Sequence, residues 1–124
     1  PYAVLVQHDI QIKANVSFED LPLSAPQHIV GRGKRKQPDY YFKMHLPYIS
    51  GEHTVFKRYE DGQEDSEGGR TGLRVEVEDR SSNGTFLNGE RVEGSRYIQL
   101  LHGDVLRFGE SSREYVVMHE NEET

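Results

Sequence analysis

The feature that most constrains the fold is the regular spacing of turn residues along the chain. Glycine, proline, asparagine and aspartate recur every eight to twelve residues, and the runs between them are short and rich in β-branched and aromatic side chains. No window of ten or more residues has a convincing helical period. Many short strands with regular turns are typical of a β-sandwich or barrel. The chain is therefore predicted to be all-β.

Ten segments are predicted to be strands. The clearest is 73–77, where Leu73, Val75 and Val77 alternate with charged residues, as in a strand with one buried face. Asn88-Gly89 predicts a hairpin, because a type I′ turn needs positive φ at both central positions. The ten segments are 4–6, 10–12, 28–30, 40–42, 54–56, 73–77, 85–87, 97–100, 104–108 and 115–118.

Length and composition indicate a single domain over residues 1–124. A chain of 124 residues can bury a core without metals or disulfides, and no linker or repeat divides it. Residues 60–72 are predicted to form a flexible acidic loop, because 61–72 contain four glycines and no apolar residue. Residues 120–124 form an acidic tail.

Composition and spacing also exclude several classes of function. The absence of cysteine removes disulfides, thiolate metal sites and thiol nucleophiles, and the six histidines have no metal-ligand spacing. The formal net charge of −6 argues against direct binding to nucleic acid, which needs a basic face. No apolar run approaches the roughly 20 residues that cross a bilayer. We expect no cofactor, no metal, no membrane contact and a monomeric state.

Three polar segments at the ends of predicted strands carry groups suited to bind a phosphate. Arg32 offers planar, charge-assisted donors, and Ser50 offers a hydroxyl beside backbone N–H groups. Asn83 lies in the polar loop 79–85, where Gly84 permits a sharp turn and the carboxamide can pair with the backbone of an extended peptide. Each segment alone is an ordinary turn. Their order, spacing and strand context together indicate one binding site.

The same segments resemble the forkhead-associated (FHA) domain over residues 28–118. The motifs that carry the resemblance are Gly31-Arg32, Ser50-x-x-His53, Asp79-x-x-Ser82-Asn83-Gly84-Thr85, Asn88-Gly89, Gly103-Asp104 and Phe108-Gly109. The resemblance implies a twisted sandwich of two antiparallel sheets with about eleven strands, and a non-catalytic adaptor that binds a phosphothreonine peptide of a partner protein. The stretch 108–117 is similar to a nuclear subgroup that works in pre-mRNA splicing and small-RNA processing. That similarity implies a nuclear location, with a cytoplasmic one as the alternative.

The resemblance also implies roles for individual residues. Arg32 and Ser50 would hold the phosphate, and Asn83 would hold the peptide backbone beside the phosphothreonine. The implied phosphopeptide-binding set is Arg32, Ser50, Gly51, Ser82 and Asn83. The implied loop-supporting set is Gly31, His53 and Gly84. Auxiliary phosphate contacts are expected from Lys34, Arg35 or Arg80.

Two departures from the family pattern keep other functions open. Tyr48 stands where a basic residue is common, and Gly51 stands where many relatives have a side chain that reaches the ligand. The first alternative is a phospho-independent interaction scaffold of the same fold. Separately, the pair Ser50 and His53 leaves a serine hydrolase as a remote alternative, although the GxSxG elbow is missing.

Overall fold

The computed structural model describes residues 1–7, 20–33, 40–44, 46–60, 73–110 and 113–120. These residues form eleven strands and no helix. The described residues therefore contain no helix that is long and apolar enough to span a membrane. The strands are β1 (Ala3–Gln7), β2 (Leu21–Leu23), β3 (Gln27–Gly31), β4 (Tyr41–Lys43), β5 (Thr54–Glu60), β6 (Leu73–Asp79), β7 (Thr85–Leu87), β8 (Glu90–Arg91), β9 (Tyr97–Leu100), β10 (Val105–Phe108) and β11 (Tyr115–His119).

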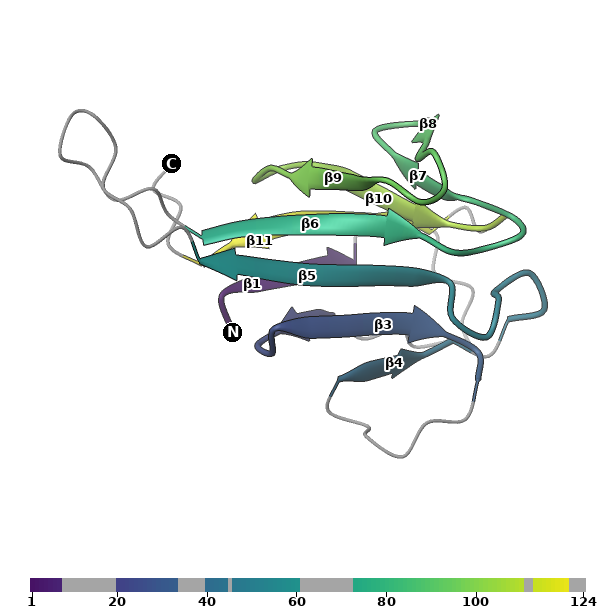
Figure 1. Ribbon diagram of the computed structural model, residues 1–124, viewed down its shortest axis with the longest axis horizontal. Helices are drawn as coiled ribbons and strands as arrows, with labels where there is room; N and C mark the ends of the chain where they lie inside the picture. The colour runs from purple at the N-terminus through teal and green to yellow at the C-terminus, as the bar shows by residue number, and fades with distance from the viewer. Residues whose placement is uncertain (8–19, 34–39, 45, 61–72, 111–112, 121–124) are drawn as a thin grey trace, which may run out of the picture.

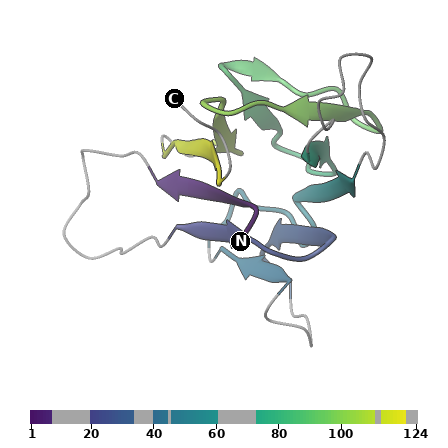
Figure 2. The same ribbon diagram turned by 90° about the vertical axis from the view of Figure 1, so that its left-hand side faces the viewer.

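The strands form two sheets that pack face to face. The six-stranded sheet has the order β2-β1-β11-β10-β7-β8, and the five-stranded sheet has the order β4-β3-β5-β6-β9. In Figure 1, β1 and β11 lie in the layer behind β5 and β6, and Figure 2 shows the layers from the side. The all-β sandwich with about eleven strands is thereby confirmed.

One strand pair departs from the expected antiparallel arrangement. β3 and β4 are parallel, with Ile29 opposite Tyr41 and Gly31 opposite Lys43. Among the described strand pairs this is the one parallel exception to the predicted antiparallel sheets. Nine residues, 32–40, separate the two strands in sequence, and β4 pairs with Ile29, Val30 and Gly31, the last three residues of β3. β4 is thus an edge strand beside the end of β3.

Alternating side chains build the core between the sheets. In β6, Val75 and Val77 are fully buried, whereas Arg74, Glu76 and Glu78 are only partly buried, as the sequence pattern predicted. An aromatic cluster fills the centre: the ring of Phe108 lies 6.4 Å from that of Phe56 and 5.6 Å from that of Tyr115. Burial raises the pKa of Tyr115 from its ordinary value of 10.0 to about 12, because the buried site disfavours the charged phenolate.

The predicted hairpin at Asn88-Gly89 is present. Both residues have positive φ, 51° and 87°, and β7 pairs with β8 through Phe86–Arg91 and Leu87–Glu90. The Asn88 carboxamide also fixes β10, since its Oδ1 accepts from Val105 N–H at 2.9 Å. Local turn chemistry therefore decides the position of β8.

Two strands were missed, and three predicted features lie outside the described residues. β2 contains Pro22, which cannot donate to a ladder and therefore hid an edge strand. β8 has only two residues, both charged. The strand expected at 10–12, the acidic loop apart from Glu60, and the tail beyond Glu120 belong to the part that the structure does not describe.

Candidate functional site

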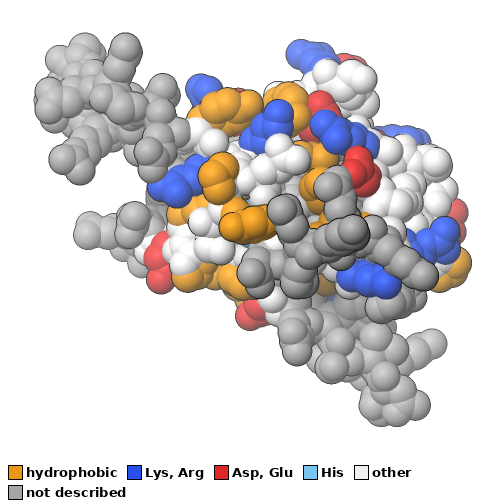
Figure 3. All heavy atoms as spheres, turned by 60° about the horizontal axis from the view of Figure 1, so that its bottom comes forward, with side chains coloured by type: hydrophobic (Ala, Val, Ile, Leu, Met, Phe, Trp, Pro, Cys, Tyr) orange, Lys and Arg blue, Asp and Glu red, His pale blue; other side chains and the backbone are white. Residues whose placement is uncertain are grey.

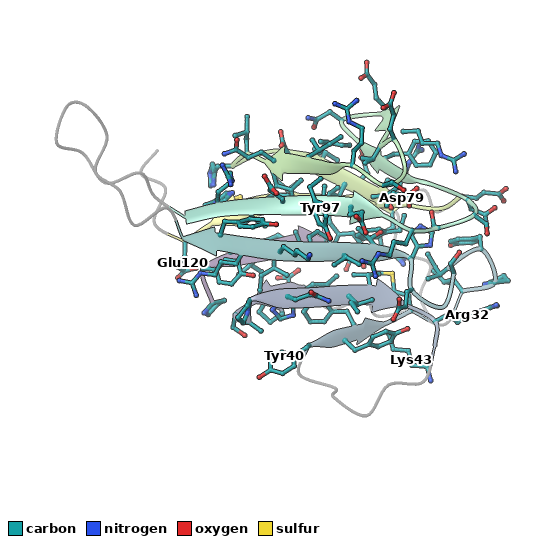
Figure 4. The ribbon with its side chains drawn as sticks, viewed as in Figure 1. Arg32, Tyr40, Lys43, Asp79, Tyr97 and Glu120 are labelled. Atoms are coloured by element: carbon teal, nitrogen blue, oxygen red, sulfur yellow. The ribbon has the colours of Figure 1, made fainter. Side chains whose placement is uncertain are left out.

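Three loops meet at one end of the five-stranded sheet. Because β5 is antiparallel to both β3 and β6, the last residues of β3 and β6 lie beside the first residue of β5. This end is on the right in Figure 1, and Figure 4 shows Arg32 there, with Glu120 at the opposite end. We call residues 31–33, 46–53 and 79–85 the loop end. It brings together all five residues of the expected phosphopeptide-binding set.

The first two loops are joined through their backbones. Arg32 N–H donates to the Ser50 carbonyl at 2.9 Å, and Gly33 N–H donates to the Gly51 carbonyl at 3.3 Å. This close approach requires Gly31, because a Cβ there would lie 2.0 Å from the Gly51 oxygen. The Arg32 residue itself is exposed, and none of the described carboxylates pairs with its guanidinium. The backbone of Arg32 is therefore fixed beside Ser50, and its exposed side chain has no carboxylate partner among the described residues.

The phenol of Tyr41 connects the same two loops. It accepts from Gly33 N–H at 2.7 Å and donates to the Gly51 carbonyl. Tyr41 packs with Ile29 and Val55 in a second small cluster outside the main core. This role has no signal in the sequence, since the run Tyr40-Tyr41-Phe42 indicates only a strand.

Replacing Tyr41 with phenylalanine is expected to lower the free energy of unfolding by about 1–2 kcal/mol. The substitution removes the phenol oxygen and leaves a backbone N–H and a carbonyl without this partner. Urea unfolding measures the loss. Tyr40→Phe is the matched control, because Tyr40 is 47% exposed, and its unfolding midpoint should stay at the wild-type value. Equal midpoints for all three proteins would contradict the bridging role.

His53 is fully buried and connects the other pair of loops. Its Nδ1 accepts from Ser50 N–H at 3.1 Å, and its Nε2 lies 2.7 Å from the Gly84 carbonyl. These two bonds require one neutral tautomer, with the proton on Nε2 donated to Gly84. Burial lowers the pKa of His53, against smaller raising effects of the Gly84 hydrogen bond and of Asp79. The imidazole is therefore a neutral structural bridge.

Acidification is expected to destabilise the domain through His53 and His28. Burial lowers the pKa of both residues below the ordinary value of 6.5, and His28 Nε2 accepts from Ser24 and Ala25 N–H groups. Below about pH 6.5 the unfolded chain therefore binds protons that the folded chain excludes. The free energy of unfolding therefore has its full value above about pH 6.5 and decreases as the pH falls below it.

The free energy of unfolding should accordingly be lower at pH 5.5 than at pH 7.5 by up to about 2 kcal/mol, as urea titrations at the two pH values would measure. The variant His28→Gln removes one of the two titrating groups. Its acid-induced loss should be about half that of the wild type. A wild-type stability that is unchanged between the two pH values would show that these histidines titrate normally.

The third loop contacts Ser50 and Tyr48 directly. Ser82 N–H donates to the Ser50 hydroxyl at 3.1 Å, and Asn83 Nδ2 donates to the Tyr48 carbonyl at 2.9 Å. The Ser50 oxygen is thereby used as an acceptor, so its O–H is left to donate elsewhere. Asn83 retains its Oδ1 acceptor and a second N–H. Both Ser82 and Asn83 are exposed.

Asp79 holds this loop in shape. Its Oδ1 accepts from Ser81 N–H, from the Ser81 hydroxyl at 2.6 Å and from the Thr85 hydroxyl at 2.8 Å. Thr54 then donates to Thr85 Oγ1 at 2.7 Å, which ties the loop to the start of β5. Gly84 has φ of 96°, a conformation that favours glycine. The structural roles of Asp79 and Thr85 were not assigned from the sequence, although both belong to the motif.

The expected auxiliary cations have different positions. Lys34 and Arg35 lie outside the described residues. Arg80 is engaged with two carboxylates, Glu78 and Glu52, and its hydrogen bond to Glu78 raises its pKa. Lys43, which was not expected here, is exposed and lies at the same end as Arg32 in Figure 4.

The arrangement suits anion binding better than hydrolysis. His53 contacts the backbone N–H of Ser50 rather than its hydroxyl, so it is not placed as a base for a serine nucleophile. The described residues contain no group of His, Asp and Glu side chains able to hold a metal ion. In Figure 3 the described side chains mix basic, acidic and hydrophobic types over the visible face. An anion would therefore be recognised by individual hydrogen-bond donors at the loop end and not by a broadly basic face.

Comparison with known families and proteins agrees with this geometry. Residues 28–109 match the model of the FHA domain. Smad nuclear-interacting protein 1 of Mus musculus is 44% identical over 81 residues, which cover 63% of this chain and 21% of that protein. The FHA domain-containing protein DDL of Arabidopsis thaliana is 36% identical over 78 residues, 60% of this chain and 24% of that protein. The matched part of the chain thus covers less than a quarter of the length of either relative.

Solved structures with the same fold include the yeast splicing factor Pml1, studied with its integration into the RES complex. It has a TM-score of 0.70 and 26% identity, and the match covers 97% of this chain and 80% of that one. The MEK1 FHA domain in complex with a phosphothreonine peptide of HOP1 has a TM-score of 0.68 and 26% identity. That match covers 97% of this chain and 98% of the MEK1 chain.

Proposed function

Because the chain belongs to the FHA domain family, whose members are protein-interaction modules, we propose that it binds phosphothreonine-containing segments of a partner protein. The observation that carries the proposal is the convergence of Arg32, Ser50 and Asn83 at the loop end. Two backbone contacts and one hydroxyl contact join their loops. A phosphothreonine complex of a related FHA domain supports the same ligand class.

In the proposed complex each group has a distinct task. The Arg32 guanidinium and the Ser50 O–H donate to phosphate oxygens, and charge assistance makes such bonds about twice as strong as neutral ones. Gly51 contributes a backbone N–H rather than a side chain. Asn83 and Ser82 pair with the peptide backbone beside the phosphothreonine. The hydrogen bonds around His53, Tyr41 and Asp79 hold these donors in place before the ligand arrives.

The proposed setting is a nuclear RNA-processing assembly. The supporting observations are the identity to a Smad nuclear-interacting protein and the structural likeness to a yeast splicing factor. We further propose that residues 1–124 act as one independently folding, monomeric domain.

Calorimetric titration with paired peptides tests the ligand class. A pool of phosphothreonine peptides with degenerate flanks should bind, and the same pool without phosphate should not. The phosphoserine pool should bind more weakly. Equal binding of the phosphorylated and unphosphorylated pools would remove the proposal.

A phospho-independent scaffold is the second candidate. Tyr48 and Gly51 favour it, because neither side chain adds a cation near Ser50. Capture of nuclear partners before and after phosphatase treatment separates the two candidates. Retention of the same partners after treatment supports the scaffold, and their loss supports phosphothreonine recognition.

A further inference from the structure

The outer faces of the two sheets differ in composition. Side chains alternate between the two faces of a strand, so the sequence neighbours of core residues point away from the core. On the five-stranded sheet the outward positions form polar and charged cross-strand pairs, with Lys57 and Gln99 on either side of Glu76. The outer side of the six-stranded sheet faces away from the viewer in Figure 1, and its outward positions are mainly apolar. An antiparallel sheet face in contact with water is normally polar.

Nine outward residues of the six-stranded sheet, which we call the back face, form three cross-strand rows. Leu5 and Val117 are fully buried, so the residues on either side of each point outward. All nine residues are half-buried or exposed, and none belongs to the core clusters. By strand register, the first row is Pro22, Val4 and Met118, the second is Val6, Val116 and Val105, and the third is Arg107, Phe86 and Arg91.

The back face has an apolar part and a basic end. The first two rows contain no charged residue, and Met118 is 39% exposed. In the third row, Cζ of Arg107 lies 4.7 Å from the centroid of the Phe86 ring, and Arg91 is opposite Phe86. No carboxylate in the described part of the chain pairs with either arginine, including Glu114 just before β11. This basic end belongs to a chain with a net charge of −6.

The dimensions of the back face match one helix. Val4 and Phe86 are separated by three strand spacings and two rows. With strands about 4.8 Å apart and rows about 6.7 Å apart, the two residues are about 20 Å apart. An α-helix covers about 20 Å in about 13 residues.

Physical chemistry distinguishes between the possible occupants. An extended segment lying across these apolar side chains would leave its own N–H and C=O groups without partners, whereas a helix satisfies most of them internally. A second copy of this face would bring further arginines and no strand carboxylate to neutralise them, and an unpaired charge is costly to bury. A partner with carboxylates at one end of an apolar surface has the complementary charge.

We propose that the back face binds an amphipathic helix of a partner protein, about three to four turns long, with an acidic residue near one end of its apolar side. The apolar side of the helix covers Val4, Val116 and Val105, and the carboxylate pairs with Arg107. Removing these half-exposed side chains from water supplies the affinity, and the ion pair sets the direction of the helix. The inference goes beyond both candidate functions, since neither assigns this surface.

Selection from a display library tests the proposal. Segments of about 14 residues, held helical on a scaffold, are selected for binding to residues 1–124. The selected segments should share apolar residues at helical spacing and a glutamate or aspartate near one end. When a selected peptide is added, the backbone amide NMR signals of Val4, Val105 and Val116 should shift, and those of Lys57 and Gln99 should not.

Variants identify the contacts by fluorescence anisotropy with the labelled peptide. Met118→Asp should weaken binding at least about tenfold, because it places a carboxylate against an apolar and acidic ligand. Val116→Thr, which keeps the side-chain shape, should weaken it about threefold. Gln99→Asp is the matched control, since it adds the same charge at an exposed position on the other sheet, and it should bind within about twofold of wild type. Arg107→Gln should remove the roughly threefold preference for the acidic peptide over its glutamine version.

Four results would overturn the inference. No helical segment is selected, the NMR shifts lie elsewhere, or Met118→Asp and Gln99→Asp bind equally well. The fourth is a different occupant. A dimer in sedimentation equilibrium that Met118→Asp dissociates would assign the face to a second copy. Co-sedimentation with phosphatidylserine vesicles that Met118→Asp abolishes would assign it to a lipid surface.

Discussion

Replacing Arg32 with alanine is expected to reduce the affinity for phosphothreonine peptides by at least about a hundredfold, with little change in folding. The guanidinium would give two charge-assisted hydrogen bonds to a dianionic phosphate. Bonds to charged groups contribute about 1.5–3 kcal/mol each, and about 2.7 kcal/mol already corresponds to a hundredfold change. The residue is exposed, so its loss should alter the free energy of unfolding by no more than about 0.5 kcal/mol.

Calorimetry and urea unfolding measure the two quantities separately. Lys43→Ala is the matched control, because Lys43 is an exposed cation at the same end of the molecule (Figure 4). Its affinity should remain within about threefold of wild type. If both variants lose affinity equally, the site responds to general charge and not to the position of Arg32. If Arg32→Ala binds as well as wild type, the phosphate lies elsewhere.

Replacing His53 with alanine should lower the free energy of unfolding by about 3–5 kcal/mol and abolish peptide binding. The change creates a cavity beside Phe108, whose ring lies 6.1 Å from the imidazole. It also leaves Ser50 N–H and the Gly84 carbonyl without their side-chain partner, and each unsatisfied buried group costs about 1–3 kcal/mol. The loops that carry Ser50 and Asn83 would no longer be tied together.

His119→Ala provides the comparison for His53→Ala. His119 is half-buried at the opposite end of the molecule, next to Glu120, and its Nε2 lies 3.2 Å from the Leu100 carbonyl. This variant should cost about 1–2 kcal/mol and leave peptide binding unchanged. Binding by folded His53→Ala at wild-type affinity would show that the loops hold their arrangement without the imidazole.

The elements that the sequence predicted well are those with a strong local signal. The alternation in β6 and the turn at Asn88-Gly89 depend on neighbours in sequence, so their structures followed from composition and spacing. β2 and β8 were missed because Pro22 and two charged residues carry no strand signal. Pairing with β1 decides β2, and the Asn88-Gly89 turn places β8 beside β7. The parallel pairing of β4 likewise depends on β3.

The residues of the candidate site likewise divide into those that the sequence predicted and those that only the structure revealed. The motifs identified Arg32, Ser50 and Asn83, but they did not reveal that the Tyr41 phenol closes the first loop or that Asp79 accepts three hydrogen bonds within the third. The hydrogen bond from Arg91 Nη2 to the Ser82 carbonyl at 3.3 Å also has no signal in the sequence, because it arises from the β7–β8 hairpin. Asp79 belongs to a motif, but the hydrogen bonds that give it this role follow from the folded loop and not from spacing.

The amino-acid sequence by itself determined the all-β class, the turns and the types of group available for a phosphate, because strand period and turn chemistry are local properties. Only the tertiary structure decided which of these groups meet. Contacts between residues about 20 to 35 positions apart, such as Ser50 with Ser82 and Tyr48 with Asn83, form only after sheet pairing has brought the ends of β3, β5 and β6 together.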